Sequence, residues 1–239
     1  MEWVKLWNKK CCLYFSEASI ESFSDSKFFP MHTLELLITV KKDKQIAVLP
    51  KDELKKIKKW LEKSYMSKEG FVLFEGYFED VCSNFIKTIK LKDYNLFEKY
   101  VLFWKAYKDF VVMGHIISLL DKINKESIKK SEPYSIENYK RLFSNYSKTT
   151  EGQIDGLFKE IGKKFNLTKN EASMLLSNEL ILSFEKKKKP SKVLIKARQN
   201  GFLLYYDSRP MCITGESMHQ FMHDNKIKNP NHCKLWGIF

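Results

Sequence analysis

Two histidines in the last quarter of the sequence have a spacing that suits metal chemistry. His219 and His223 are four residues apart, so they would share one face of a helix, and His232 and Cys233 follow nine residues later. Zinc needs three or four nitrogen or sulfur ligands in tetrahedral geometry, and the histidine pair supplies two of them. Gln220 stands where an HExxH motif has its general-base glutamate. These four residues are metal-ligand candidates for a small metal-dependent enzyme, and solvent-facing histidines are the alternative.

A basic segment between residues 184 and 200 has the composition of an anion-binding surface. It holds seven lysine and arginine residues against one glutamate, which is nearly half of the net charge of +13. Such clusters bind phosphates or acidic partners, and a solvated linker is the alternative. The phosphate or polyanion-contact candidates are Lys186, Lys187, Lys188, Lys189, Lys192, Lys196 and Arg198. Only three of the 42 basic residues are arginines, so nucleic acid is not the favoured partner, because guanidinium groups make the bidentate contacts.

Motifs for other chemistries are missing from the sequence. It contains no Walker A, GxGxxG or GxSxG motif, and its five cysteines include no CxxC pair. Cys82 lies in an apolar helical stripe, where we expect a buried, unreactive thiol. His115 lies near the middle of a long apolar helical pattern, where we expect a core histidine. We therefore predict no catalytic residue in this chain.

Composition and hydropathy indicate a globular protein with no membrane partner. Apolar residues make up 44% of the chain, and glycine and proline are scarce, which favours long helices over a turn-rich β fold. The N-terminal residues lack the apolar core of a signal peptide. The chain also has no run of 18 apolar residues, so we expect a cytoplasmic protein.

The apolar periodicity predicts an α+β fold dominated by helices, with a helical middle region flanked by two small β-hairpin-plus-helix units. The first unit has a polar turn at residues 41–44 and a helix at 51–64. The second has strands at 202–206 and 211–213 and a helix at 215–224. The predicted middle elements are a helix from about Glu75, helices at 94–124, 135–146 and 150–164, and a capping box from Thr168 to Glu171.

Four regions follow from these elements. Residues 1–66 comprise an irregular aromatic arm, a hairpin and a helix, and residues 67–185 form the helical region. Residues 186–199 form a basic linker or helix, in which Val193 and Leu194 should face inward. Residues 200–239 form a hairpin and a helix that lead into the start of a truncated domain.

The C-terminal region carries a family resemblance. The pattern KxRxxGFLLYY at residues 196–206 is followed by a turn, a second strand and a TGE helix start at residues 214–216. An LTxxEA pattern at residues 167–172 lies upstream, and residues 234–239 resemble the first strand of a further domain. This order resembles the region before the phosphohistidine swivelling domain in small prokaryotic proteins similar to phosphoenolpyruvate synthase, which belong to the PEP-utilising enzymes.

The resemblance implies a non-catalytic N-terminal part that positions a swivelling domain, in cis or in trans. The family's phosphorylated histidine lies in a TxxxGxxxxH context that has no match here, and the ATP-grasp half is absent. Phosphotransferase activity, with Mg²⁺ and ATP or phosphoenolpyruvate, would therefore belong to a parent protein. Because the chain ends on the apolar residues 236–239, we expect a fragment or a divided gene, with the swivelling domain encoded directly after Phe239. A lysine-rich module that binds nucleic acid or an acidic partner is the main alternative.

Overall fold

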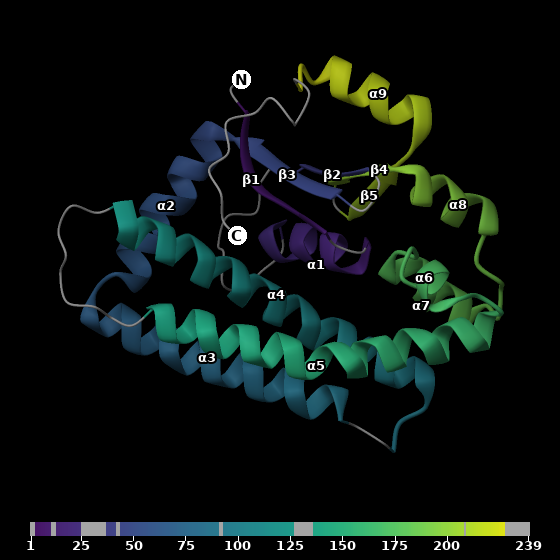
Figure 1. Cartoon of the computed structure of the whole chain (residues 1–239), viewed down its shortest axis with the longest axis horizontal. Helices are drawn as coiled ribbons and strands as arrows, with labels where there is room; N and C mark the ends of the chain where they lie inside the picture. The colour runs from purple at the N-terminus through teal and green to yellow at the C-terminus, as the bar shows by residue number, and fades with distance from the viewer. Residues whose placement is uncertain are drawn as a thin grey trace.

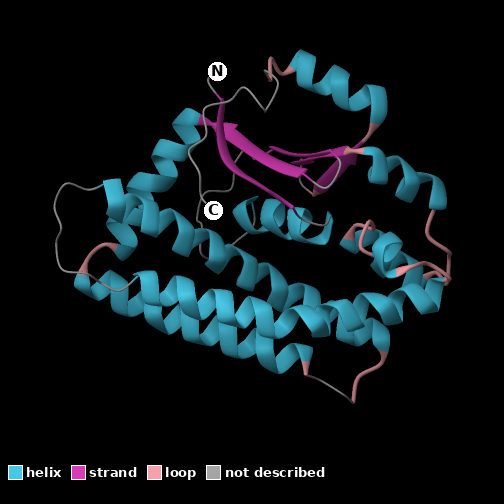
Figure 2. Ribbon diagram, viewed as in Figure 1, coloured by secondary structure: helices cyan, strands magenta, loops and turns pink. Residues whose placement is uncertain are grey.

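The structure of the chain is a computed structural model, and it describes residues 3–10, 13–24, 37–41, 44–90, 93–126, 136–207 and 209–227. In these residues the fold is α+β and dominated by helices, as the sequence predicts. A single antiparallel sheet lies between one short helix on one side and the long helices on the other (Figures 1 and 2).

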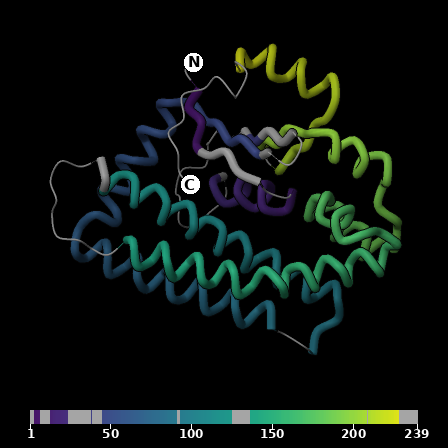
Figure 3. The backbone as a smooth tube through the Cα atoms, in the orientation of Figure 1, coloured from purple at the N-terminus to yellow at the C-terminus, as the bar shows by residue number. Residues whose placement is uncertain are grey.

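The two predicted hairpins are parts of one sheet. The strands are β1 (Trp3–Lys10), β2 (Leu37–Lys41), β3 (Lys44–Pro50), β4 (Phe202–Tyr206) and β5 (Pro210–Ile213). They lie in the order β1-β3-β2-β4-β5, and every neighbouring pair is antiparallel. The hairpins meet where β2 pairs with β4, with Ile38 opposite Leu204. The two units therefore form one layer, and Figure 3 shows the purple N-terminal strand in this layer and the yellow C-terminal helix above it.

The N-terminal arm is not irregular over the residues that the structure describes. Strand β1 pairs with β3 along its length, and α1 (Leu13–Ser24) follows it. The serines that break the apolar pattern of α1 form hydrogen bonds inside the protein: Ser19 Oγ donates to the Phe15 carbonyl and Ser22 Oγ donates to the Lys108 carbonyl. Because the buried hydroxyls are satisfied, the polar residues do not stop the helix from entering the core.

Eight further helices are present in the described residues. The first four are α2 (Lys51–Tyr65), α3 (Lys68–Ile89), α4 (Leu96–Glu126) and α5 (Ile136–Phe165). The others are α6 (Lys169–Ala172), α7 (Ser177–Glu185), α8 (Lys192–Asn200) and α9 (Gly215–Asp224). Helix α4 contacts α1, α3 and α5, so it is the central helix that its all-round apolar pattern predicts. None of the described helices is long and apolar enough to cross a membrane.

Two helix boundaries differ from the sequence prediction. Helix α3 begins at Lys68 and not near Glu75, because Ser67 Oγ accepts from the Gly70 N–H as an N-cap. Residues 136–165 do not form two helices, because α5 is continuous. Thr150 is no N-cap, since its Oγ1 donates to the carbonyls of Tyr146 and Ser147 within the helix. The capping box from Thr168 to Glu171 is confirmed.

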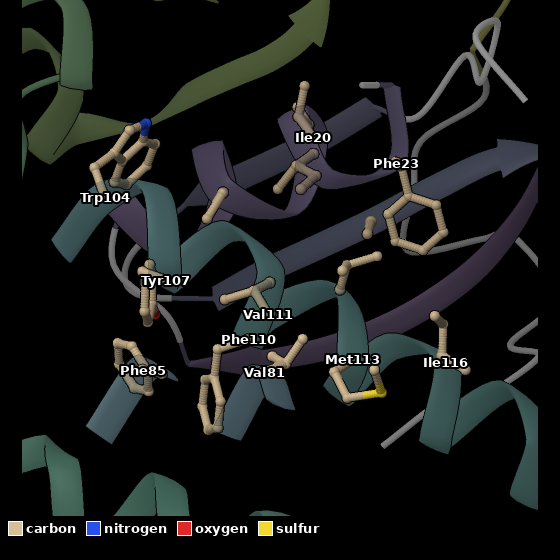
Figure 4. Close-up of a cluster of buried hydrophobic side chains, with 14 of the residues drawn as sticks. Ile20, Phe23, Val81, Phe85, Trp104, Tyr107, Phe110, Val111, Met113 and Ile116 are labelled. Carbon is tan, nitrogen blue, oxygen red and sulfur yellow. The ribbon is translucent and has the colours of Figure 1, made fainter. Parts of the chain in front are cut away.

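The core fills the space between the sheet and α3, α4 and α5. Figure 4 shows side chains of α1, α3 and α4 that pack together, among them Phe23, Phe85 and Phe110. On the other face of the sheet, Phe221 of α9 stacks on Tyr205 with ring centroids 4.6 Å apart. Both faces of the sheet are therefore covered.

Candidate functional site

The lysine-rich segment is exposed and lies on the connection from α7 to α8 and on α8 itself. Lys186, Lys187, Lys188 and Lys189 precede the helix, Lys192 and Lys196 lie within it, and all six side chains face solvent. Ser191 caps α8, with its Oγ accepting from the Leu194 N–H. Figure 1 shows this connection at the edge of the molecule. Six of the seven predicted anion-contact residues are therefore available to a partner.

The side of α8 that faces the protein interior is not the side that the sequence analysis predicts. Val193 and Leu194 are 79% and 48% exposed, whereas Ile195 and Arg198 are buried. Ile195 and Arg198 are three residues apart, so they lie on the same side of this short helix, and that side packs against the body of the protein. The prediction that Val193 and Leu194 face inward is wrong, because the ion pair of Arg198 decides how the helix is rotated.

Arg198 does not belong to the basic surface. Its guanidinium is 5% exposed and binds both carboxylate oxygens of Glu179, with Nη1 to Oε2 at 2.6 Å and Nη2 to Oε1 at 2.7 Å. Nη1 also donates to the Met174 carbonyl at 2.9 Å. This bidentate pair satisfies the charge inside the protein and fastens α8 to α7. Arg198 is therefore an anchor and not an anion contact.

A buried carboxylate lies beside this pair. Glu17 of α1 is 1% exposed and accepts from the Ser177 N–H, at 3.0 and 2.9 Å from its two oxygens, and from Ser177 Oγ at 2.7 Å. Burial, and then the negative charge of Glu21, raise the pKa of Glu17 to about 8, although the Ser177 hydrogen bonds oppose the shift. Glu17 therefore holds its proton in the folded protein at neutral pH.

We call Glu17, Ser177, Glu179, Arg198 and Cys212 the interior polar cluster. Arg198 also interacts with the Cys212 thiol of β5, whose pKa burial raises to about 11. The thiol is therefore protonated at neutral pH and is not a nucleophile. The polar groups of the cluster bond to one another across α1, α7, α8 and β5. The cluster therefore acts as a clamp that holds the basic segment and the last hairpin to the helical body.

Sequence reasoning missed the clamp for a physical reason. Glu17 and Ser177 are 160 positions apart and meet only through the tertiary fold. Two local signals were present. Glu17 is set among the small and apolar residues of α1, and Arg198, one of only three arginines in the chain, lies on the short helix α8. Neither signal identifies the residue that Glu17 or Arg198 binds.

The predicted metal ligands are placed only in part. His219 and His223 lie on α9, and both are exposed. His223 Nδ1 lies 3.3 Å from Asp224 Oδ1. Within the described ranges no group of three or more His, Cys, Asp or Glu residues could hold a metal ion, and His232 and Cys233 lie outside those ranges.

Two other sequence predictions are confirmed. Cys82 is 1% exposed, and burial raises its pKa to about 12, so its thiol is unreactive as expected. His115 is fully buried in the core, with Nε2 at 3.0 Å from Ser19 Oγ and its ring against Phe23.

Comparisons with known proteins add no relative. A scan against protein-family models matched none, and searches of curated proteins and of solved structures found no match.

Proposed function

We propose that this chain is a non-catalytic scaffold that positions a phosphohistidine swivelling domain of the phosphoenolpyruvate synthase kind. The observation that carries the proposal is the basic segment: two of its six exposed lysines lie on α8, which the Arg198–Glu179 pair fixes in place, and the other four lie on the connection that leads into α8. The resemblance of residues 196–206 and 214–216 to the region before that domain gives the partner. A cytoplasmic location fits this role.

The physical basis of the proposal is short-range electrostatics. A phosphohistidine carries a negative charge, and at physiological salt a lysine ammonium acts on it over about 8 Å. Two of the six lysines lie on the anchored helix α8 and four lie on the short connection between α7 and α8, so this surface loses less conformational entropy on binding than one on a free linker. In this account the chain binds and orients the phosphorylated domain. The transferred phosphoryl group, Mg²⁺, and ATP or phosphoenolpyruvate belong to the partner and its parent protein.

Calorimetry with an isolated swivelling domain tests the proposal. We expect the phosphorylated domain to bind more tightly than the unphosphorylated domain, and added salt to reduce the difference. The purified chain should form no phosphoenzyme when it is incubated with ATP or phosphoenolpyruvate. Equal affinity for both forms, or no binding of either, would remove the scaffold function.

A binding module for nucleic acid or an acidic protein is the second candidate. The observation that favours it is that the exposed Val193 and Leu194 stand among the exposed lysines, so the surface offers both charge and apolar area. It predicts retention on heparin and a steep loss of affinity for single-stranded DNA or an acidic peptide as salt rises. Elution from heparin at low salt would exclude it and leave the scaffold function standing.

A further inference from the structure

The molecule has a pocket that the scaffold function does not use. It has a volume of about 280 Å³ and lies between α1, α4 and α5. Its wall is aromatic and aliphatic, formed by Phe15, Tyr107, Phe110, Val111, Phe143 and Ile154. Pockets between the helices of a bundle are common ligand sites, and the volume of this one is just below the roughly 300–1,000 Å³ of typical small-molecule sites. Its occupant would be smaller than a nucleotide.

The wall of the pocket is held in place by packing. Phe110 and Phe143 stack with centroids 4.4 Å apart and an interplanar angle of 21°. Phe143 lies against α4 because Gly114 has no side chain, and a Cβ there would be 2.5 Å from the Phe143 ring. Phe15 is in turn held by the core, where its ring meets His115 edge to face. The pocket is therefore formed before any ligand arrives.

The rim of the pocket carries two unlike charges. Ser144, Ser147, Lys148 and Glu151 line it from α5. Lys148 and Glu151 are both exposed, and neither forms an ion pair with another residue that the structure describes. An ammonium and a carboxylate are thus both available at the mouth of an apolar slot. The net charge of +13 raises the local concentration of anions over that of cations. An anion at the Lys148 ammonium is therefore favoured over a cation at the Glu151 carboxylate.

We propose that this pocket binds a small aromatic anion, with its ring system among Phe15, Phe110 and Phe143 and its carboxylate or sulfonate at Lys148. Offset stacking and burial of the ring provide affinity, and the lysine orients the charged end. The pocket shares no residue with the basic segment, so this inference does not depend on the scaffold function.

Titration with 2-naphthoate tests the inference on the full chain. The methyl groups of Val111 and Ile154 line the pocket and are buried, so their NMR shifts should change and saturate with one naphthoate per chain. The methyl groups of Ile57, a buried residue of α2, serve as the internal control. Shifts that do not saturate at millimolar naphthoate, or that appear at Ile57 instead, would overturn the proposal.

Two matched pairs of variants locate the ligand. Ser147→Trp places an indole in the pocket and should abolish the saturable shifts, whereas Thr149→Trp, on an exposed position of the same helix, should leave them. Lys148→Gln should weaken naphthoate binding several-fold, whereas Glu151→Gln should leave it equal or tighter. Circular dichroism checks that each variant is folded. Unchanged affinity in Ser147→Trp, or weaker binding in Glu151→Gln than in Lys148→Gln, would contradict the assignment.

Discussion

Glu17 is a buried acid that the fold keeps protonated, and this makes stability depend on pH. Its pKa is about 8 in the folded protein against an ordinary value of 4.5 for a glutamate carboxyl, with burial as the main cause. The folded state therefore binds the proton more tightly than the unfolded state. The stabilisation is complete below about pH 4.5 and is lost as the pH rises toward 8.

We predict that Glu17→Gln removes this loss of stability. The amide oxygen can still accept from the Ser177 N–H, and the side chain carries no charge at any pH. The variant should be more stable than the wild type by about 1–3 kcal/mol at pH 8, after the cost of its unpaired amide protons, and less stable near pH 4.5. Urea unfolding at pH 5 and pH 8 measures both differences. A wild-type free energy of unfolding that rises between these two pH values would contradict the assignment.

Glu179→Gln, in the same cluster, should have the opposite effect on stability. It would leave the Arg198 guanidinium buried with an amide in place of its counter-charge. We expect a loss of about 3–5 kcal/mol in the free energy of unfolding, measured in the same urea experiment. A loss below about 1 kcal/mol would mean that the pair is solvated and that α8 is not anchored by it.

At the scale of elements, the turn between α2 and α3 depends on one glycine. Gly70 lies in the first turn of α3, and a Cβ there would be 2.2 Å from the backbone oxygen of Ser64. A backbone atom cannot move aside as a flexible side chain can. The close approach of the two helices at this point therefore requires glycine.

Gly70→Ala and Gly76→Ala form a matched pair in the same helix. Gly70→Ala should destabilise the protein by about 1–3 kcal/mol through overpacking. Gly76 is exposed, and its Cβ would meet nothing within 4 Å, so Gly76→Ala should stabilise the protein by about 0.5–1 kcal/mol through helix propensity. Thermal unfolding measures both variants. A loss of stability in Gly76→Ala as large as in Gly70→Ala would show that the close approach is not the cause.

Local signals in the sequence were enough for some elements and not for others. Helices α2 and α4 and the box at Thr168 follow from apolar spacing and capping chemistry, which act within a few residues. Helix α1 and the inward face of α8 depend on partners far along the chain, so periodicity alone misassigned them. Arg198 shows the limit most clearly, because its place at the surface or in the core depends on Glu179, which lies on another helix.

At the scale of the whole molecule, the sheet joins both halves of the chain. Strand β4 pairs with β2 in the middle of the sheet, and Thr39 lies opposite Leu203. The residues of this pair are more than 160 positions apart, so their contact forms only when the whole domain folds. The last hairpin is thus part of the same cooperative unit as the N-terminal strands.

This topology predicts how the amides exchange. The amides of β4 that bond to β2 should exchange with the same free energy as those of β3, because both require global unfolding. Native-state hydrogen exchange measured by NMR gives both values. Exchange of β4 at a clearly lower free energy would show that the hairpin opens by itself, as a separate unit would.

The proposed scaffold function requires that the six lysines of the basic segment contact an anionic, phosphorylated domain. The most direct measurement is the calorimetric affinity of that phosphorylated domain for a variant in which Lys186, Lys187, Lys188, Lys189, Lys192 and Lys196 are all glutamine. The matched control replaces the six lysines of α2 by glutamine and changes the net charge equally: Lys51, Lys55, Lys56, Lys58, Lys59 and Lys63. We predict a loss of affinity of about tenfold or more in the first variant, because six contacts of a few tenths of a kcal/mol each exceed 1.4 kcal/mol, and little change in the control. Equal losses in both variants, or none in either, would contradict the claim.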